Sequence, residues 1–219
     1  MRVGVLGTGG VGRTIGTKLV GLGHEVRMGS RAAGGAAAAG WSAALGAAAS
    51  EGTFAEAADF GEIVFVCTSG AGTVDAVGSA RAGLAGKVLI DVTNPLEFSG
   101  GGPSLFVGIT DSLGERVQEA VPEARVVKAL NTVTAEVMVD PGLVPGDHVL
   151  FVCGNDPVAK ERTVAVLGEF GWPADRVIDC GDLTGARATE AYLLIWLRLM
   201  NWVGDARFNI DVRRPGPTR

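Results

Sequence analysis

A glycine-rich loop near the N-terminus carries the clearest chemical signal in the chain. Residues 7–12 read Gly-Thr-Gly-Gly-Val-Gly, which is the spacing G-x-G-x-x-G. The apolar segment Met1–Leu6 before the loop predicts a buried strand, and Arg13–Leu22 after it predicts a helix. A loop of this kind binds the diphosphate of a dinucleotide, because backbone N–H groups and the positive end of the helix dipole face the phosphates. We therefore expect a dinucleotide to contact Gly7, Thr8, Gly9, Gly10, Val11 and Gly12.

The residues after the second predicted strand indicate which dinucleotide is bound. Glu25–Met28 predicts that strand, and Gly29-Ser30-Arg31 follows it. An NAD site usually has an Asp or Glu here, bonded to the ribose 2′-hydroxyl. This chain has Ser30 and Arg31 instead, a hydroxyl and a guanidinium fork that suit a phosphate. The pair predicts an NADP(H) site, and the simpler alternative is an exposed arginine after a turn.

Three further strands are predicted to end in small polar residues. Continuous apolar runs at Glu62–Cys67, Lys87–Val92 and Arg125–Leu130 are typical of parallel strands buried on both faces. The carboxyl ends of such strands share one edge of the sheet, where ligands bind. The Ser/Gly-rich stretch Ser99–Ser104 is expected to form a loop, mobile over the site. The predicted cofactor-binding set is completed by Thr68, Ser69, Asn94, Lys128 and Asn131.

The order of these segments predicts an α/β fold with a doubly wound parallel sheet of the Rossmann type. Helices are expected at Ala32–Ala49 and Ile109–Val121, and a capping box at Thr53–Glu56 opens one more turn. The dinucleotide-binding core is predicted to span residues 1–132, and a continuous α/β extension spans residues 133–219. The extension contains a further β-α-β unit, expected at His148–Cys153, Pro157–Phe170 and Arg176–Cys180, and a frayed tail at Arg213–Arg219.

The extension ends in a long apolar helix predicted at Arg187–Asn209. Leu193, Trp196, Met200 and Val203 form one stripe, and further leucines cover much of the remaining circumference. A helix that is apolar nearly all round belongs in a large core, a membrane or an interface. Arg198 and Asn201 argue against a membrane span, so we expect a homodimer formed through this helix.

Composition excludes several classes of function. The chain has 219 residues, 47% of them hydrophobic, and a net charge of −5, so neither disorder nor a nucleic-acid footprint is indicated. Its three cysteines lack C-x-x-C spacing and it has only two histidines, so no metal site is predicted. We expect the three cysteines to be buried thiols of a reducing compartment. Without a signal peptide or long apolar run, a cytoplasmic protein with no membrane contact is expected.

The sequence resembles the NADPH-dependent oxidoreductases that reduce the 8-hydroxy-5-deazaflavin coenzyme (coenzyme F420), and the related reductase domains of membrane ferric reductases. The resemblance covers most of the chain. It rests on the glycine loop, the Leu22-Gly23-His24 turn, Gly29-Ser30-Arg31, Val127–Thr132 and the final helix.

By this resemblance, Ser30 and Arg31 match the family's 2′-phosphate contacts, and Thr8 falls at its glycine-loop threonine. Arg187, Ala188 and Glu190 lie in a segment similar to the entry of its last helix. The resemblance also implies homodimers or higher assemblies, with the nicotinamide facing the deazaflavin as co-substrate.

The chain departs from the deazaflavin-reducing members at several positions. Those members usually carry one more residue in the glycine loop than this chain does. Gly34 and Gly35 stand where they often have a lysine, and Asn131 stands where they tend to have a histidine. No proline accompanies Ser69-Gly70, and Lys128–Thr132 looks more like the ferric-reductase branch.

No side chain is assigned a catalytic role, because no Ser-His-Asp set or paired acid is evident. Hydride transfer to a flavin-like ring needs little more than stacking of the two rings and exclusion of water. The leading prediction is hydride transfer between NADP(H) and a small-molecule acceptor, above all the deazaflavin coenzyme. One alternative is an imine or carbonyl reductase with Lys128 as proton donor, although a salt bridge explains that lysine more simply. The other is a non-catalytic NADP(H) sensor.

Overall fold

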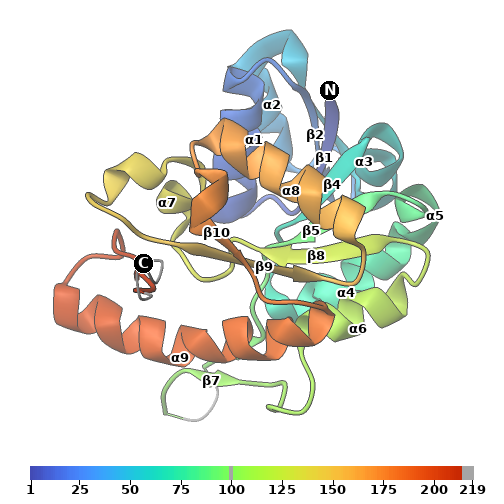
Figure 1. The fold of residues 1–219 in the computed structure, drawn as a ribbon. Helices are drawn as coiled ribbons and strands as arrows, with labels where there is room; N and C mark the ends of the chain where they lie inside the picture. The colour runs from blue at the N-terminus through green and yellow to red at the C-terminus, as the bar shows by residue number, and fades with distance from the viewer. Residues whose placement is uncertain (99–100, 214–219) are drawn as a thin grey trace.

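The computed structural model describes residues 1–98 and 101–213. Its main sheet has eight strands in the order β10-β9-β8-β5-β4-β1-β2-β3 (Figure 1). The strands are β1 (Arg2–Leu6), β2 (Glu25–Ser30), β3 (Ala49–Thr53), β4 (Ile63–Val66), β5 (Val88–Asp91), β8 (Arg125–Ala129), β9 (Leu150–Gly154) and β10 (Val177–Asp179). The six strands from β3 to β8 are parallel, and the chain order reverses beside β1. The predicted doubly wound α/β fold is confirmed.

Helices cover both faces of the sheet (Figure 1). One face carries α1 (Gly10–Gly21), α2 (Ala36–Leu45), α7 (Ala135–Val139) and α8 (Pro157–Phe170). The other carries α3 (Phe54–Phe60), α4 (Gly70–Ser79), α5 (Arg81–Leu84), α6 (Leu113–Ala120) and the long α9 (Ala186–Val203). Successive strand residues alternate between the two buried clusters: Val5 belongs to one and Leu6 to the other. Burial on both faces explains the continuous apolar runs of these strands.

The β9–α8–β10 unit runs opposite to the rest of the sheet. β9 pairs with β10 in parallel, but β8 and β9 are antiparallel, with Lys128 opposite Cys153. A parallel neighbour of β8 would need a helix long enough to cross the sheet. α7 has only five residues, so the chain stays at the carboxyl edge of β8 and β9 starts from there.

The structure differs from the predicted elements mainly between residues 32 and 49. The alanine-rich stretch predicted as one helix contains α2 and the 3₁₀ turn Gly46–Ala48, and residue 49 begins the unpredicted strand β3. Gly46 has a φ of 77°, which ends α2 where alanine propensity alone would continue it. Residues 50–53 have no apolar alternation that would indicate a strand, and β3 forms through its parallel pairing with β2, in which Glu51 lies opposite Met28.

Smaller differences occur elsewhere. The helix predicted at Ile109–Val121 starts at Leu113 instead, because Ser112 caps α6. The helix predicted at Arg187–Asn209 already ends at Val203, because Gly204 adopts a left-handed φ of 77° after α9. Helices α4, α5 and α7 were not predicted. Nor was the ribbon of β6 (Leu96–Glu97) and β7 (Ser104–Leu105). Of the stretch predicted as a mobile loop, residues 99–100 lie outside the described residues, and so does the predicted tail after Arg213.

The cysteine prediction is correct for two residues and wrong for the third. Cys67 and Cys153 are buried thiols, whereas Cys180 is a free, exposed thiol. It follows the three-residue edge strand β10, so no neighbouring strand covers it on its outer side. Among the described helices, none combines the length and apolar character needed to cross a bilayer.

Candidate cofactor and acceptor site

The glycine loop joins β1 to α1, and its glycines differ in what surrounds them. Gly7 has a φ of 123°, and a side chain there would come within 2.6 Å of the Cys67 carbonyl oxygen. A side chain on Gly12 would overlap the Gly7 carbonyl oxygen, so this glycine lets α1 approach the loop. Around Gly9 and Gly10 a side chain would meet open space. The loop is therefore tight at both ends and open in the middle, as a phosphate-binding loop requires.

Two helices begin at this opening without a side-chain cap. The N-cap of α1 is Gly9, which has no side chain, and the N-cap of α4 is Ser69, whose hydroxyl accepts no hydrogen bond from its helix. Neither helix has an acidic residue in its first turn. The first backbone N–H groups of both helices remain available to an anion, and the helix dipoles favour one.

The first of two adjoining cavities, here called cavity A, lies beside the glycine loop and has a volume of about 740 Å³. Seven predicted residues line it: Gly7, Thr8, Gly9, Ser30, Arg31, Thr68 and Ser69. The Arg31 side chain is exposed, and the Ser30 hydroxyl donates a 2.6 Å hydrogen bond to the Ala32 carbonyl. Asp75, which sequence reasoning missed, also lines the cavity.

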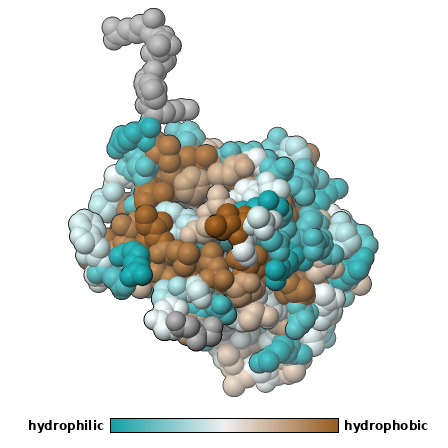
Figure 2. Space-filling model, turned by 90° about the horizontal axis from the view of Figure 1, so that it is seen from below, coloured by the Kyte–Doolittle hydropathy of each residue, from teal (hydrophilic) through white to brown (hydrophobic). Residues whose placement is uncertain are grey.

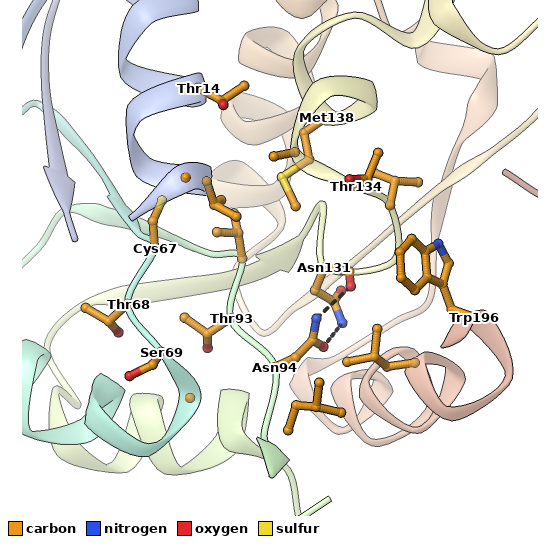
Figure 3. A pocket seen from close by; sticks show the side chains of 18 of the residues that line it. Thr14, Cys67, Thr68, Ser69, Thr93, Asn94, Asn131, Thr134, Met138 and Trp196 are labelled. Atoms are coloured by element: carbon orange, nitrogen blue, oxygen red, sulfur yellow. Dashed lines mark hydrogen bonds between the residues drawn. The ribbon is translucent and has the colours of Figure 1, made fainter. Parts of the chain in front are cut away.

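The second cavity, cavity B, has a volume of about 660 Å³ and shares Cys67, Thr68 and Ser69 with cavity A (Figure 3). It extends from the glycine loop to α7 and α9. The predicted residues that line it are Gly10, Val11, Thr68, Ser69, Asn94 and Asn131. Sequence reasoning missed the rest of its wall: Thr14, Gly70, Val92, Thr93, Leu96, Val133, Thr134, Ala135, Glu136, Met138, Leu193 and Trp196, in addition to Cys67.

Asn131 follows a residue with a strained backbone and is held in place by hydrogen bonds. Leu130 before it is the only non-glycine residue of the described chain with a positive φ, at 65°. This conformation is costly for a buried leucine and is typical of functional sites. The Asn131 Nδ2 donates to Asn94 Oδ1 at 3.0 Å and to the Thr189 carbonyl at 3.1 Å. Two strand ends and α9 thus meet at cavity B.

Two predicted contact residues lie away from the cavities. Gly12 is buried beneath the loop, where it allows close packing. Lys128 lines neither cavity, and its ammonium is fully enclosed by the carboxylates of Asp91 and Glu190. The predicted direct contact between Lys128 and a cofactor is therefore wrong, and the salt-bridge interpretation is correct. The reason is the pleat, which turns Lys128 into the protein while Asn131 beyond the strand reaches the cavity.

Ionisable groups are scarce around cavity B. Among the described residues, Glu136 on α7 is the only carboxylate that lines it, and this side chain is exposed. The Cys67 thiol is buried, and burial raises its pKa well above the ordinary range, so it stays protonated. The opposite end of the cavity is apolar, with Leu193 and Trp196 from α9, and the Trp196 ring stacks on Phe208 with centroids 5.3 Å apart.

The doubly wound sheet, the open glycine loop and the crevice where the strand order reverses define a dinucleotide-binding protein. A profile of the family described as coenzyme F420-dependent NADP oxidoreductase matches residues 2–95. The F420-dependent NADP reductase of Methanothermobacter marburgensis is 31% identical over 225 residues, which cover 96% of this chain and 98% of that protein. The chain belongs to the coenzyme F420-dependent NADP oxidoreductase family, and it is an NADP-dependent oxidoreductase.

Two further proteins are similar to this chain. The metalloreductase STEAP3 of Rattus norvegicus is 31% identical over 199 residues, which cover 91% of this chain but only 37% of that longer protein. A crystal structure from Arthrobacter sp. FB24, provisionally assigned as an F420-dependent NADP reductase, is 43% identical. It superposes with a TM-score of 0.92, covering 98% of this chain and 100% of that one. Family membership sets aside the alternative of a non-catalytic sensor.

Proposed function

We propose that this protein transfers hydride reversibly between NADP(H) and a flat, flavin-like ring, the 8-hydroxy-5-deazaflavin of coenzyme F420. The names of the archaeal and Arthrobacter relatives support this acceptor. The observation in this chain that carries the proposal is cavity B, a space beside the glycine loop with apolar and amide walls and one exposed carboxylate.

The cofactor half of the proposal rests on cavity A. Its open glycines and the two uncapped helix N-termini fit a diphosphate, and Ser30 and Arg31 at its end fit a 2′-phosphate. In the proposal, the nicotinamide end passes Thr68 and Ser69 into cavity B, where bound NADPH supplies the hydride. Asn94 and Asn131 then offer polar contacts on one wall.

The acceptor half rests on what cavity B can do. Hydride transfer between two rings requires that they stack closely and that water is excluded. Leu193, Trp196 and Met138 provide apolar surface for such a ring. Hydride transfer needs no acid or base at the reacting carbon. A cavity whose described wall contains one exposed carboxylate is therefore sufficient for this reaction.

The alternative of an imine or carbonyl reductase loses its candidate proton donor. Such an enzyme needs an acid within hydrogen-bond reach of the substrate nitrogen or oxygen. Lys128 was the only candidate, and it is enclosed by two carboxylates away from the cavity. No other observation in the described residues favours this reaction.

Isotope transfer tests the proposal. NADPH that carries deuterium at nicotinamide C4, in the position from which the hydride is transferred, is mixed anaerobically with the protein and the deazaflavin. Direct transfer places the deuterium on carbon 5 of the reduced ring, where it does not exchange with solvent, and mass spectrometry detects it. Reduced deazaflavin without deuterium, or no reduction at all, would contradict the proposal. The same mixture without protein is the control.

A further inference from the structure

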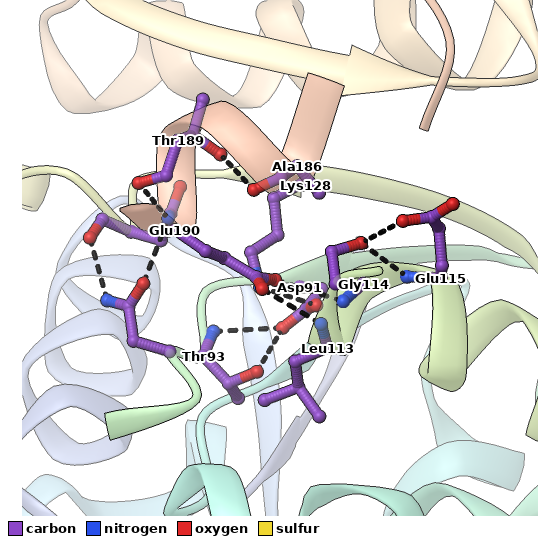
Figure 4. Close-up of polar contacts among 12 residues, drawn as sticks. Asp91, Thr93, Leu113, Gly114, Glu115, Lys128, Ala186, Thr189 and Glu190 are labelled. Atoms are coloured by element: carbon purple, nitrogen blue, oxygen red, sulfur yellow. Dashed lines mark hydrogen bonds and ion pairs between the residues drawn. The ribbon is translucent and has the colours of Figure 1, made fainter. Parts of the chain in front are cut away.

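A buried ion triad lies behind cavity B. The Lys128 Nζ is 2.9 Å from Asp91 Oδ2 and 2.7 Å from Glu190 Oε1, and all three side chains are enclosed (Figure 4). Removal of three charges from water costs free energy that their mutual attraction only partly returns. Well-packed apolar residues often stabilise a fold as well or better, so the triad calls for a reason besides stability.

One carboxylate of the triad is joined to the wall of cavity B. The Asp91 Oδ1 accepts the backbone N–H of Thr93 at 2.9 Å and its hydroxyl at 2.7 Å. Thr93 lines cavity B, and so does Asn94 after it. The Asp91 carboxylate therefore fixes the position of the segment after β5, which forms part of the wall of cavity B.

The other carboxylate anchors the start of α9. Glu190 accepts the backbone N–H groups of Leu113 at 2.8 Å and Gly114 at 3.0 Å, at the N-terminus of α6. One residue earlier, the Thr189 carbonyl accepts the side chain of Asn131. The next turns of α9 carry the two apolar residues that line cavity B.

The triad is charged and nearly balanced. Desolvation acts to lower the pKa of Lys128, but Asp91 and Glu190 outweigh it and raise the pKa, so the ammonium persists. The one surplus negative charge faces the N-terminus of α6, whose dipole and N–H groups offset it. Loss of the lysine leaves two carboxylates facing each other, which separates the elements that they hold.

We infer that Lys128 is a positioning residue for the acceptor: it holds α9 and the end of β5 at the separation that a flat ring requires in cavity B. This inference rests on the proposed function. The lysine touches neither substrate nor cofactor, and it acts through Thr93 on one wall and α9 on the other. Cavity A is lined by the glycine loop, the end of β2, α4 and the segment after β4, and no described residue of α6, α9 or the segment after β5 lines it. The binding of the adenosine half therefore does not depend on Lys128.

The test compares Lys128→Met with the double variant Lys128→Met/Glu190→Gln, which removes one charge of each sign. In Lys128→Met, the KM for the deazaflavin should rise about tenfold to a hundredfold, while the Kd for NADPH stays within about twofold. In the double variant, stability to urea should recover toward wild type but the raised KM should persist. Lys160→Met, which removes a lysine paired with Asp179 at the sheet edge, is the control.

Amide hydrogen exchange provides a readout that needs no acceptor. In Lys128→Met, exchange should rise about tenfold in the first turns of α9 and at Leu113 and Gly114, and should stay unchanged in α8. A less stable variant with wild-type KM and wild-type exchange in α9 would overturn the inference, and so would a double variant that regains the wild-type KM. If wild-type protein fails to reduce the deazaflavin, the proposed function falls, and the exchange data alone then decide whether the triad holds α9.

Discussion

Asn94 and Asn131 bind each other reciprocally at the carboxyl edge of the sheet. The Asn131 Nδ2 donates to Asn94 Oδ1 at 3.0 Å, and the Asn94 Nδ2 donates to the Asn131 carbonyl at 2.8 Å. The pair joins the ends of two neighbouring strands, β5 and β8, and both side chains line cavity B (Figure 3). The amides therefore give this wall a fixed shape without adding a charge.

Removal of Asn94 should destabilise the protein measurably. Asn94→Ala deletes both hydrogen bonds and leaves the Asn131 carbonyl without this donor, which should cost about 1–3 kcal/mol of unfolding free energy. Urea denaturation measures this cost, with the exposed Asn201→Ala as the control. Equal stability of Asn94→Ala and wild type would show that the amide pair is not a structural link.

Arg31 should determine the preference for NADPH over NADH. A charge-assisted bond to the 2′-phosphate contributes about 1.5–3 kcal/mol, so Arg31→Ala should weaken NADPH binding roughly tenfold to a hundredfold and leave NADH nearly unchanged. Titration calorimetry with both cofactors checks this, and Arg81→Ala, which breaks an exposed pair with Glu123, is the control. Equal affinity of the wild-type protein for the two cofactors would contradict the NADP assignment.

Gly12 should tolerate no side chain. Gly12→Ala pushes a methyl group into the Gly7 carbonyl, so it should cost about 1–3 kcal/mol and weaken NADPH binding. Gly21→Ala, in the same helix but facing open space, should leave both quantities close to wild type. Thermal melts and NADPH titrations compare the two variants. Similar behaviour of both would mean that the loop does not need the close approach of α1.

The thiols should differ in reactivity. Cys180 is exposed, whereas Cys153 is buried and desolvation raises its pKa to about 12. Burial also raises the pKa of Cys180, so its thiolate fraction and its labelling rate should increase with pH above neutrality. Ellman's reagent should modify one thiol in the native protein and all three after unfolding. Fast modification of three thiols in the native protein would contradict the described burial.

We also propose that the exposed side of α9 mediates a homodimer. Leu194, Ile195, Trp202 and Val203 are exposed there, and Figure 2 shows this side of the molecule, apolar over much of its area. Trp202, at 84% exposure, is a cleaner probe than the buried Trp196. Trp202→Arg should convert the dimer to a monomer in sedimentation experiments, and Val158→Arg on α8 should not. A wild-type protein that sediments as a monomer at micromolar concentration would contradict this proposal.

The sequence predicted the parts of the site that depend on short-range patterns. The glycine loop, Ser30-Arg31 and the polar strand ends are recognised by spacing, because each follows directly from a strand that periodicity identifies. Met138 and Trp196 could not be assigned in this way. They reach cavity B through the path of α7 and α9, which tertiary packing sets, and an apolar residue in a helix carries no sign of facing a ligand.

Lys128 and β3 illustrate the same limit in different ways. The position of Lys128 before a strand end was clear, but its partners Asp91 and Glu190 lie 37 and 62 residues away in the chain, and only the fold brings them together. β3 (Ala-Ser-Glu-Gly-Thr) follows an alanine-rich helix and lacks the apolar alternation of a strand, and pairing with β2 makes it one.

The most direct measurement of the central claim is an anaerobic acceptor panel. The purified protein and NADPH are mixed in turn with the deazaflavin, FMN, FAD and a series of cyclic imines and carbonyl compounds, and absorbance follows each acceptor and NADPH. Our account predicts that the deazaflavin is bleached and that the other compounds are not reduced. Bleaching of FMN or FAD but not the deazaflavin, or NADPH consumption only with imines or carbonyl compounds, would contradict it.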